Sequence, residues 1–208
     1  MTVKNFIPYI LIFVSLIIFG CDNRTEEEKM KGYYDEVKLY SGQIKSLIKK
    51  IDDKKISNEE AYKQLTAIMK KFDKMDKQIE ALNFGKETGK EGDEILEFFY
   101  SSLFDDEGNF TGFDKIKFEV TPQNRNNVLI FTKQVLARTA KDLYNAALFY
   151  AQKSSTSESN AASSGYSIAT NSTFLTLAGE FKQEDAIYSI EMLDCLFASL
   201  KINSPQKK

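Results

Sequence analysis

Histidine and tryptophan are both absent from the 208 residues of this chain. Without an imidazole there is no Ser-His-Asp or Cys-His catalytic group, no HExxH zinc site and no histidine proton shuttle. Carboxylates, lysine and tyrosine remain chemically competent, but the chain contains no Walker loop, no GxGxxG motif and no recognisable pair of catalytic carboxylates. The sequence therefore predicts a protein that is not an enzyme and that holds no cofactor or metal.

Cysteine is scarce, with only Cys21 and Cys195 present, so a scaffold held together by several disulfides is excluded. Cys195 lies in the apolar run 192–197, with no positive charge beside it in the sequence to lower the pKa of its thiol. We interpret it as a small, buried, apolar side chain rather than as a reactive nucleophile.

Glycine and proline are also few, 10 and 3 residues respectively, which favours long helices over many short strands. Once residues 1–20 are removed, the chain carries 27 basic and 30 acidic side chains, a net charge of −3. A nucleic-acid-binding protein normally has a clear excess of basic residues, so no nucleic-acid partner is expected.

The N-terminus has the layout of a bacterial lipoprotein signal. Lys4 precedes an apolar run from Phe6 to Phe19, and Gly20 and Cys21 follow it. The run is about 14 residues long, shorter than the ~20 that a membrane-spanning helix needs. We expect residues 1–20 to be a signal peptide and Cys21 to carry the lipid, with an uncut anchor helix as the alternative.

The segment after the signal is polar. Residues 21–28 are interpreted as the lipidated cysteine followed by a flexible tether, Asp-Asn-Arg-Thr-Glu-Glu-Glu. So short a tether spans only about 15 Å, so the domain should sit close to the membrane.

Apolar residues then recur at helical spacing. The pattern predicts a helix from about Glu27 to Asp53 and a second one that Ser57 opens and that continues to Leu82, forming a helical hairpin. Asp93 to Phe104 forms a third helix, so apolar that it lies either in the core or in a homodimer interface.

The C-terminal half is predicted to be helical as well. Thr121 and Pro122 begin a long, central fourth helix that ends near Lys153, and residues 154–165 form a polar, mobile loop. Residues 168–203 hold two helices with a break at 179–183. The fold class is therefore all-α, a single domain at 29–203 of five to six helices, with residues 204–208 as a disordered tail.

Three features suggest ligands, and each has a plainer interpretation. The acidic turn 105–113 lacks the glutamate that closes an EF-hand calcium loop, so a solvated turn is favoured. Asp residues interleave with the lysines of the first two helices, which favours a solvated face over a site for glycosaminoglycan or anionic lipid. Three tyrosines lie on the inward stripe of the first helix, which favours the core over a partner anchor: Tyr33, Tyr34 and Tyr40.

The chain resembles the outer-surface lipoproteins of Borrelia spirochaetes. The resemblance rests on Ile18-Phe19-Gly20-Cys21, the polar tether, the histidine-free helical body rich in Lys, Ile, Phe and Asn, and the lysine-ended tail. It implies a helical bundle anchored by lipid in the outer membrane and facing outward at the cell surface. It also implies binding of a host protein, such as a complement regulator, plasminogen or a matrix component. No site residue other than Cys21 can be transferred from it. A structural or assembly lipoprotein of the envelope is the alternative.

Overall fold

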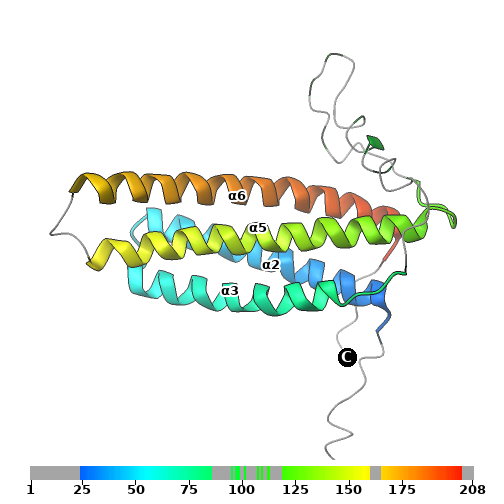
Figure 1. The fold of residues 1–208 in the computed structure, drawn as a ribbon, viewed down its shortest axis with the longest axis horizontal. Helices are drawn as coiled ribbons and strands as arrows, with labels where there is room; N and C mark the ends of the chain where they lie inside the picture. Colours follow the sequence, from blue (N-terminus) through cyan, green and yellow to red (C-terminus); the bar gives the residue numbers. More distant parts are fainter. Residues whose placement is uncertain are drawn as a thin grey trace, which may run out of the picture.

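The computed structural model describes residues 24–85, 119–159 and 165–202, and seven residues between 86 and 118. This part of the chain contains four α-helices and no strand, which confirms the predicted all-α class (Figure 1). The predicted number of five to six helices is not confirmed. The helices span these ranges: α2 (Glu26–Asp52), α3 (Asn58–Glu80), α5 (Arg125–Ser159) and α6 (Gly165–Leu200).

The helices form two hairpins that pack side by side. The shorter hairpin consists of α2 and α3, and the longer one of α5 and α6. The contacts of α5 with α6 and with α3 are the most extensive between the helices, and α5 also meets α2, which supports the central position predicted for the fourth helix. The helix begins at Arg125, three residues after the predicted first helical position at Pro122. The α5–α6 hairpin extends beyond α2 and α3 at the end where α5 finishes and α6 begins (Figure 1).

A capping box starts α2. The Thr25 Oγ1 accepts a hydrogen bond from the Glu28 N–H at 3.1 Å, and the Glu28 carboxylate accepts one from the Thr25 N–H at 2.8 Å. These bonds satisfy amide groups that have no partner inside the helix. Because α2 already begins at Glu26, the predicted tether is wrong for residues 26–28.

The turn between α2 and α3 explains why the two helices are antiparallel. The Lys55 N–H donates to the Lys50 carbonyl at 2.8 Å and the Lys54 N–H to the Ile51 carbonyl at 3.0 Å, a Schellman ending in which Lys54 is left-handed (φ 54°). Ser57 then caps α3 by accepting from the Glu60 N–H at 3.2 Å. The predicted N-terminal hairpin is thus confirmed.

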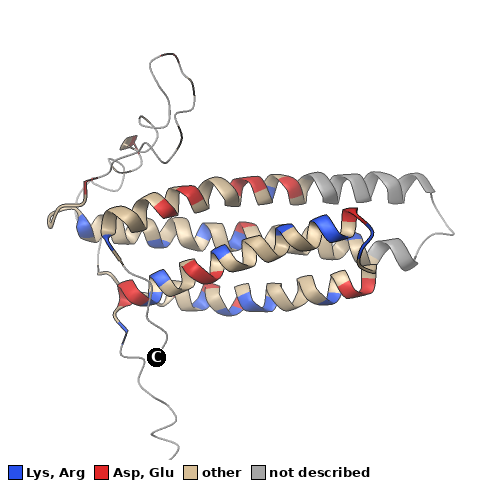
Figure 2. Cartoon of the chain, turned by 180° about the vertical axis from the view of Figure 1, so that it is seen from behind, with Lys and Arg blue, Asp and Glu red and all other residues tan. Residues whose placement is uncertain are grey.

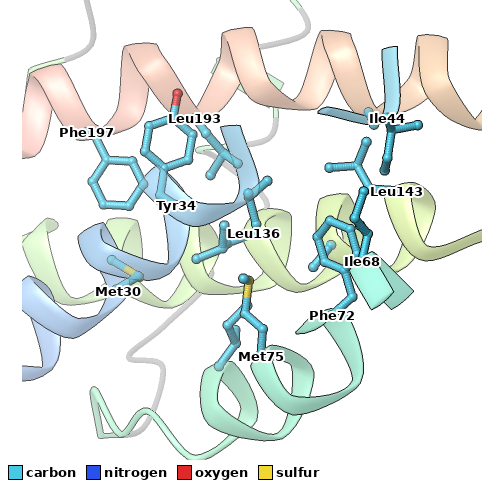
Figure 3. Close-up of a cluster of buried hydrophobic side chains, with 14 of the residues drawn as sticks. Met30, Tyr34, Ile44, Ile68, Phe72, Met75, Leu136, Leu143, Leu193 and Phe197 are labelled. Carbon is cyan, nitrogen blue, oxygen red and sulfur yellow. The ribbon is translucent and has the colours of Figure 1, made fainter. Parts of the chain in front are cut away.

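The core lies between the two hairpins and is lined mainly by aliphatic and aromatic side chains (Figure 3). Leu136 and Leu143 of α5 are completely buried, with 0% of each exposed. They point toward Phe72 of α3 and Leu193 of α6 in the same cluster (Figure 3). Full burial of one such side chain stabilises a fold by about 1.5–3 kcal/mol.

Two predictions about the long hairpin are wrong. Helix α5 continues to Ser159 and α6 begins at Gly165, so most of the predicted mobile loop at 154–165 is helical. The Ser154 hydroxyl donates to the Tyr150 carbonyl at 3.0 Å, which lets this polar residue remain in the helix. Helix α6 is also continuous through 179–183, where a break was predicted.

Gly179 acts as a packing position in α6 and does not end a helix. A β-carbon placed there would lie 2.7 Å from Cε2 of Tyr150, whose side chain is only 2% exposed. The absence of a side chain therefore allows α6 to approach α5 closely.

Several other predicted elements lie wholly or mostly outside the described residues. Of the third helix predicted at 93–104, only Ile95, Glu97, Phe98 and Ser101 are described, and all four are helical. The tail at 204–208 lies outside the described residues, as does most of the acidic turn at 105–113. The proposed dimer interface on the third helix therefore stays a prediction.

Replacing Gly179 with alanine should destabilise the protein by about 1–3 kcal/mol, because the buried Tyr150 ring has no room to move away from the new methyl group. Gly42→Ala is the matched control. No atom lies within 4 Å of that position, which is inside α2, so alanine should stabilise by about 0.5–1 kcal/mol. Urea unfolding followed by circular dichroism measures both. Equal effects of the two substitutions would contradict the close packing of α5 and α6.

Leu136→Asp places a charge without a partner in the centre of the bundle, so we expect a loss of several kcal/mol and an unfolded or barely folded chain. Leu39→Asp is the control. Because 56% of Leu39 is exposed, this substitution should leave the free energy of unfolding nearly unchanged. Thermal melts by circular dichroism distinguish them. A Leu136→Asp variant that melts like the parent would show that α5 is not central.

Candidate functional site: the outer face of helix α6

The structure does not describe the predicted lipid site. Cys21 lies outside the described residues, so lipidation stays a prediction. Within the described ranges, no group of three or more His, Cys, Asp or Glu side chains is arranged to hold a metal ion.

The tyrosines of α2 belong to the core. Tyr34 is 1% exposed, and its ring stacks on that of Phe197 with centroids 4.7 Å apart. The Tyr40 ring meets Phe72 edge-on at 5.5 Å. The structure therefore supports core packing over a partner anchor for these two residues, and Tyr33 also packs against the core.

Tyr34 lies in a polar contact between α2 and α6. Its hydroxyl donates to the Ile190 carbonyl at 3.4 Å, and the ammonium groups of Lys31 and Lys38 lie over its ring at 5.0 and 5.5 Å. Lys38 also pairs with Asp194 at 2.9 Å. Burial, followed by the neighbouring Asp194 carboxylate, raises the pKa of the Tyr34 hydroxyl well above its ordinary value.

The lysines predicted as a solvated face are exposed along α2 and α3. Figure 2 shows basic and acidic residues interspersed along these helices. This mixture leaves no extended positive field for an anionic polymer. The exposed lysines on the two helices and their connection are Lys45, Lys49, Lys50, Lys54, Lys55, Lys70, Lys71, Lys74 and Lys77.

Cys195 is half-buried on α6 and forms no disulfide. Burial raises the pKa of its thiol, an effect only partly opposed by a hydrogen bond with Ser199. A raised pKa reduces the thiolate fraction, which is the reactive form. The predicted structural role of Cys195 agrees with this environment.

A groove of about 480 Å³ lies between α3 and α5. Acidic side chains of α3 line one wall and basic side chains of α5 the other, namely Asp73, Asp76, Glu80, Arg138 and Lys141. Its aromatic lining includes Phe72, but that side chain is 1% exposed and already belongs to the core. The opposite charges of the walls offset each other, so the groove does not favour a partner of either charge.

A buried carboxylate orients the only lysine in the middle of α6. Asp142 of α5 has 8% of its side chain exposed, and its Oδ1 lies 3.1 Å from Nζ of Lys182. The Asp142 Oδ2 is buried without a hydrogen-bond partner, 3.9 Å from Nε of Arg138. Lys182 also lies 3.3 Å from Asp185. The pairing with Asp142 brings the Lys182 charge toward α5 and away from the outer side of α6.

The outer face of α6 carries large exposed aromatic side chains. Phe181 is 65% exposed and Tyr188 is 56% exposed, and their spacing of seven positions, about two helical turns, places both on the same side of the helix. Glu184 and Glu191 share that side at steps of three and four residues. These four residues are called the outer stripe below: Phe181, Glu184, Tyr188 and Glu191.

The opposite side of α6 is buried against the rest of the bundle, which explains why the outer stripe faces solvent. Ala186, Leu193 and Leu196 are 0% exposed, and Phe197 is 3% exposed. The sequence did not distinguish the buried side of α6 from the exposed side, because Phe181 and Ile187 continue the apolar pattern of the buried positions. The glutamates at 184 and 191, at helical spacing from both aromatics, are the sequence signal by which this outward face could have been found.

The raised pKa of Tyr34 predicts a loss of stability at alkaline pH. Above about pH 10 the unfolded chain releases this proton while the folded chain retains it, so the free energy of unfolding falls as pH rises. Tyr34→Phe removes the ionising group and should make this fall shallower. Urea unfolding at pH 8 to 11 measures the two slopes. Identical slopes in both proteins would contradict the burial of the Tyr34 hydroxyl.

The chain matches no protein-family model, and a search of curated proteins and one of solved structures also give no match. The candidate site therefore rests on the contacts and exposure of the residues of this chain.

Proposed function

We propose that this protein is a lipid-anchored bacterial surface protein that binds a host protein without catalysing a reaction. The N-terminal run that ends in Gly20 and Cys21 supports the anchor. The outer stripe of α6 supports the binding role, and it is the observation that carries the proposal.

The direction of the helices supports display of the bundle away from a membrane. Helix α2 begins at Glu26, five residues after Cys21, at the end of the bundle where α5 begins and α6 finishes (Figure 1). A lipid on Cys21 would hold this end near the bilayer and direct the opposite end, where α5 finishes and α6 begins, outward. None of the described helices is long and apolar enough to cross a membrane.

Exposed aromatic side chains on a rigid helix are suited to protein recognition. Tyrosine is enriched among the residues that dominate binding energy at protein interfaces, and aromatic residues in general are enriched there. Phe181 and Tyr188 project from a helix whose opposite side is fixed in the core, so few main-chain degrees of freedom are lost on binding. Their removal should therefore weaken binding without unfolding the bundle.

Capture of host serum proteins by the mature chain tests this role. The double substitution Phe181→Ser and Tyr188→Ser should reduce the captured partner at least tenfold, while circular dichroism and the melting temperature stay close to those of the parent. The control is Leu39→Ser with Tyr62→Ser, which removes exposed apolar side chains from α2 and α3. A partner lost equally from both variants would show that the outer stripe is not the site.

The anchor and the surface location have their own test. Labelled palmitate should appear in the wild-type protein and be absent from Cys21→Ser, and protease added to intact cells should digest the wild-type protein. The amount of palmitate-labelled protein in the membrane fraction, compared before and after protease treatment, reports both lipidation and digestion from outside the cell. A lipidated protein that external protease leaves intact would instead favour the alternative, a structural or assembly lipoprotein inside the envelope.

A further inference from the structure

We infer that the outer stripe of α6 binds a cationic, amphipathic segment of its protein partner, rich in arginine or lysine. This inference rests on the proposed binding function and specifies the chemistry of the partner. It follows from three observations: the charge of the outer face, the position of the aromatic rings, and the internal pairing of the nearby basic groups.

The charge on this part of α6 is strongly one-sided. Between residues 178 and 200 the helix carries five acidic side chains and one basic side chain, Lys182. Lys182 is held by Asp142 and Asp185, and Lys38 of α2 holds Asp194. Three carboxylates on the outer side form no ion pair with any described residue: Glu180, Glu184 and Glu191.

The aromatic rings alternate with these carboxylates along one ridge. The order Phe181, Glu184, Tyr188, Glu191 covers about 15 Å of helix at 1.5 Å per residue. An arginine or lysine of the partner can pair with a glutamate while its apolar stem covers the neighbouring ring, and a cation above a ring face adds further attraction. Apolar partner residues would cover the remaining ring surface.

Other occupants fit the outer stripe less well. A nucleic acid or an anionic lipid surface would be repelled by the three carboxylates that have no ion pair. Among the described residues, the basic surface that a second copy of the chain could offer to these glutamates is the mixed lysine face of α2 and α3 (Figure 2). That contact would join two different surfaces. Each pair of copies would therefore leave one outer stripe and one lysine face free to bind further copies, and the assembly would grow into open chains unless a ring closed. A basic segment of another protein satisfies both the charge and the apolar surface.

The test uses the mature chain, residues 21–208, with Cys21→Ser to prevent disulfide formation. The probe is a fluorescein-labelled 18-residue peptide with arginine and leucine at helical spacing, and the control peptide has glutamate in place of arginine. Fluorescence anisotropy gives Kd at 50 and 300 mM NaCl. We expect binding of the arginine peptide only, with Kd rising about tenfold at the higher salt concentration.

Two variants with the same change in net charge separate a specific site from general attraction. Glu184→Gln with Glu191→Gln should raise Kd about tenfold, whereas Glu36→Gln with Glu59→Gln, exposed residues on α2 and α3, should change it less than twofold. Phe181→Ser with Tyr188→Ser should also weaken binding about tenfold. An equal effect of the two glutamine variants, or no effect of either, would overturn the inference.

The same variants distinguish failure of this inference from failure of the proposed function. A serum partner that is lost with Phe181→Ser and Tyr188→Ser, yet retained with Glu184→Gln and Glu191→Gln, would leave the binding function intact and reject a cationic partner. Light scattering of the mature chain tests whether the outer stripe binds a second copy of the chain. A dimer or larger assembly that the serine variant converts to monomer would assign the outer stripe to a second copy and overturn the inference.

Discussion

The fold depends on the burial of α5 by the other three helices. Leu136 and Leu143 are completely buried, and α5 contacts α2, α3 and α6. Apolar burial is non-directional and grows with the area removed from water, so it brings the helices together without defining their exact spacing. Close contacts such as Gly179 against Tyr150 set how near α6 can come to α5. Once α6 is held there, its remaining side must face solvent.

Ion pairs then determine the electrostatic character of that solvent side. Asp142 draws the Lys182 ammonium toward α5, and Lys38 neutralises Asp194 at the contact between α2 and α6. Exposed ion pairs such as Lys38–Asp194 contribute little to stability, roughly 0–1 kcal/mol. Their larger consequence is that Lys182 and Lys38 are occupied, while the glutamates of the outer stripe form no ion pair with any described residue. The packing of the core and the charge of the candidate binding face are therefore connected.

Local signals in the sequence predicted the N-terminal hairpin well. Ser57 with Glu60, the pattern from which the start of the second helix was predicted, does stand at the start of α3. The corresponding pair at the start of α2, Thr25 with Glu28, was assigned to the tether. The errors arose where local propensity and packing disagree. Gly179 and the polar residues from Ser154 onward have weak helical preference, which suggested a break and a loop. Contacts between α5 and α6 outweigh that preference, because packing supplies more energy than intrinsic propensity.

The sequence by itself determined the helical class, the absence of histidine chemistry, and the predicted lipid site at Cys21, since these depend on composition and on order along the chain. It also carried the spacing that places Phe181, Glu184, Tyr188 and Glu191 on one side of a helix. Only the tertiary structure decided which apolar side of α6 is buried and which is exposed. Phe181 and Phe197 are both phenylalanines in apolar surroundings, yet one is 65% exposed and the other 3%. The difference comes from the contacts of Phe197 with the rest of the bundle, which the spacing of apolar residues does not specify.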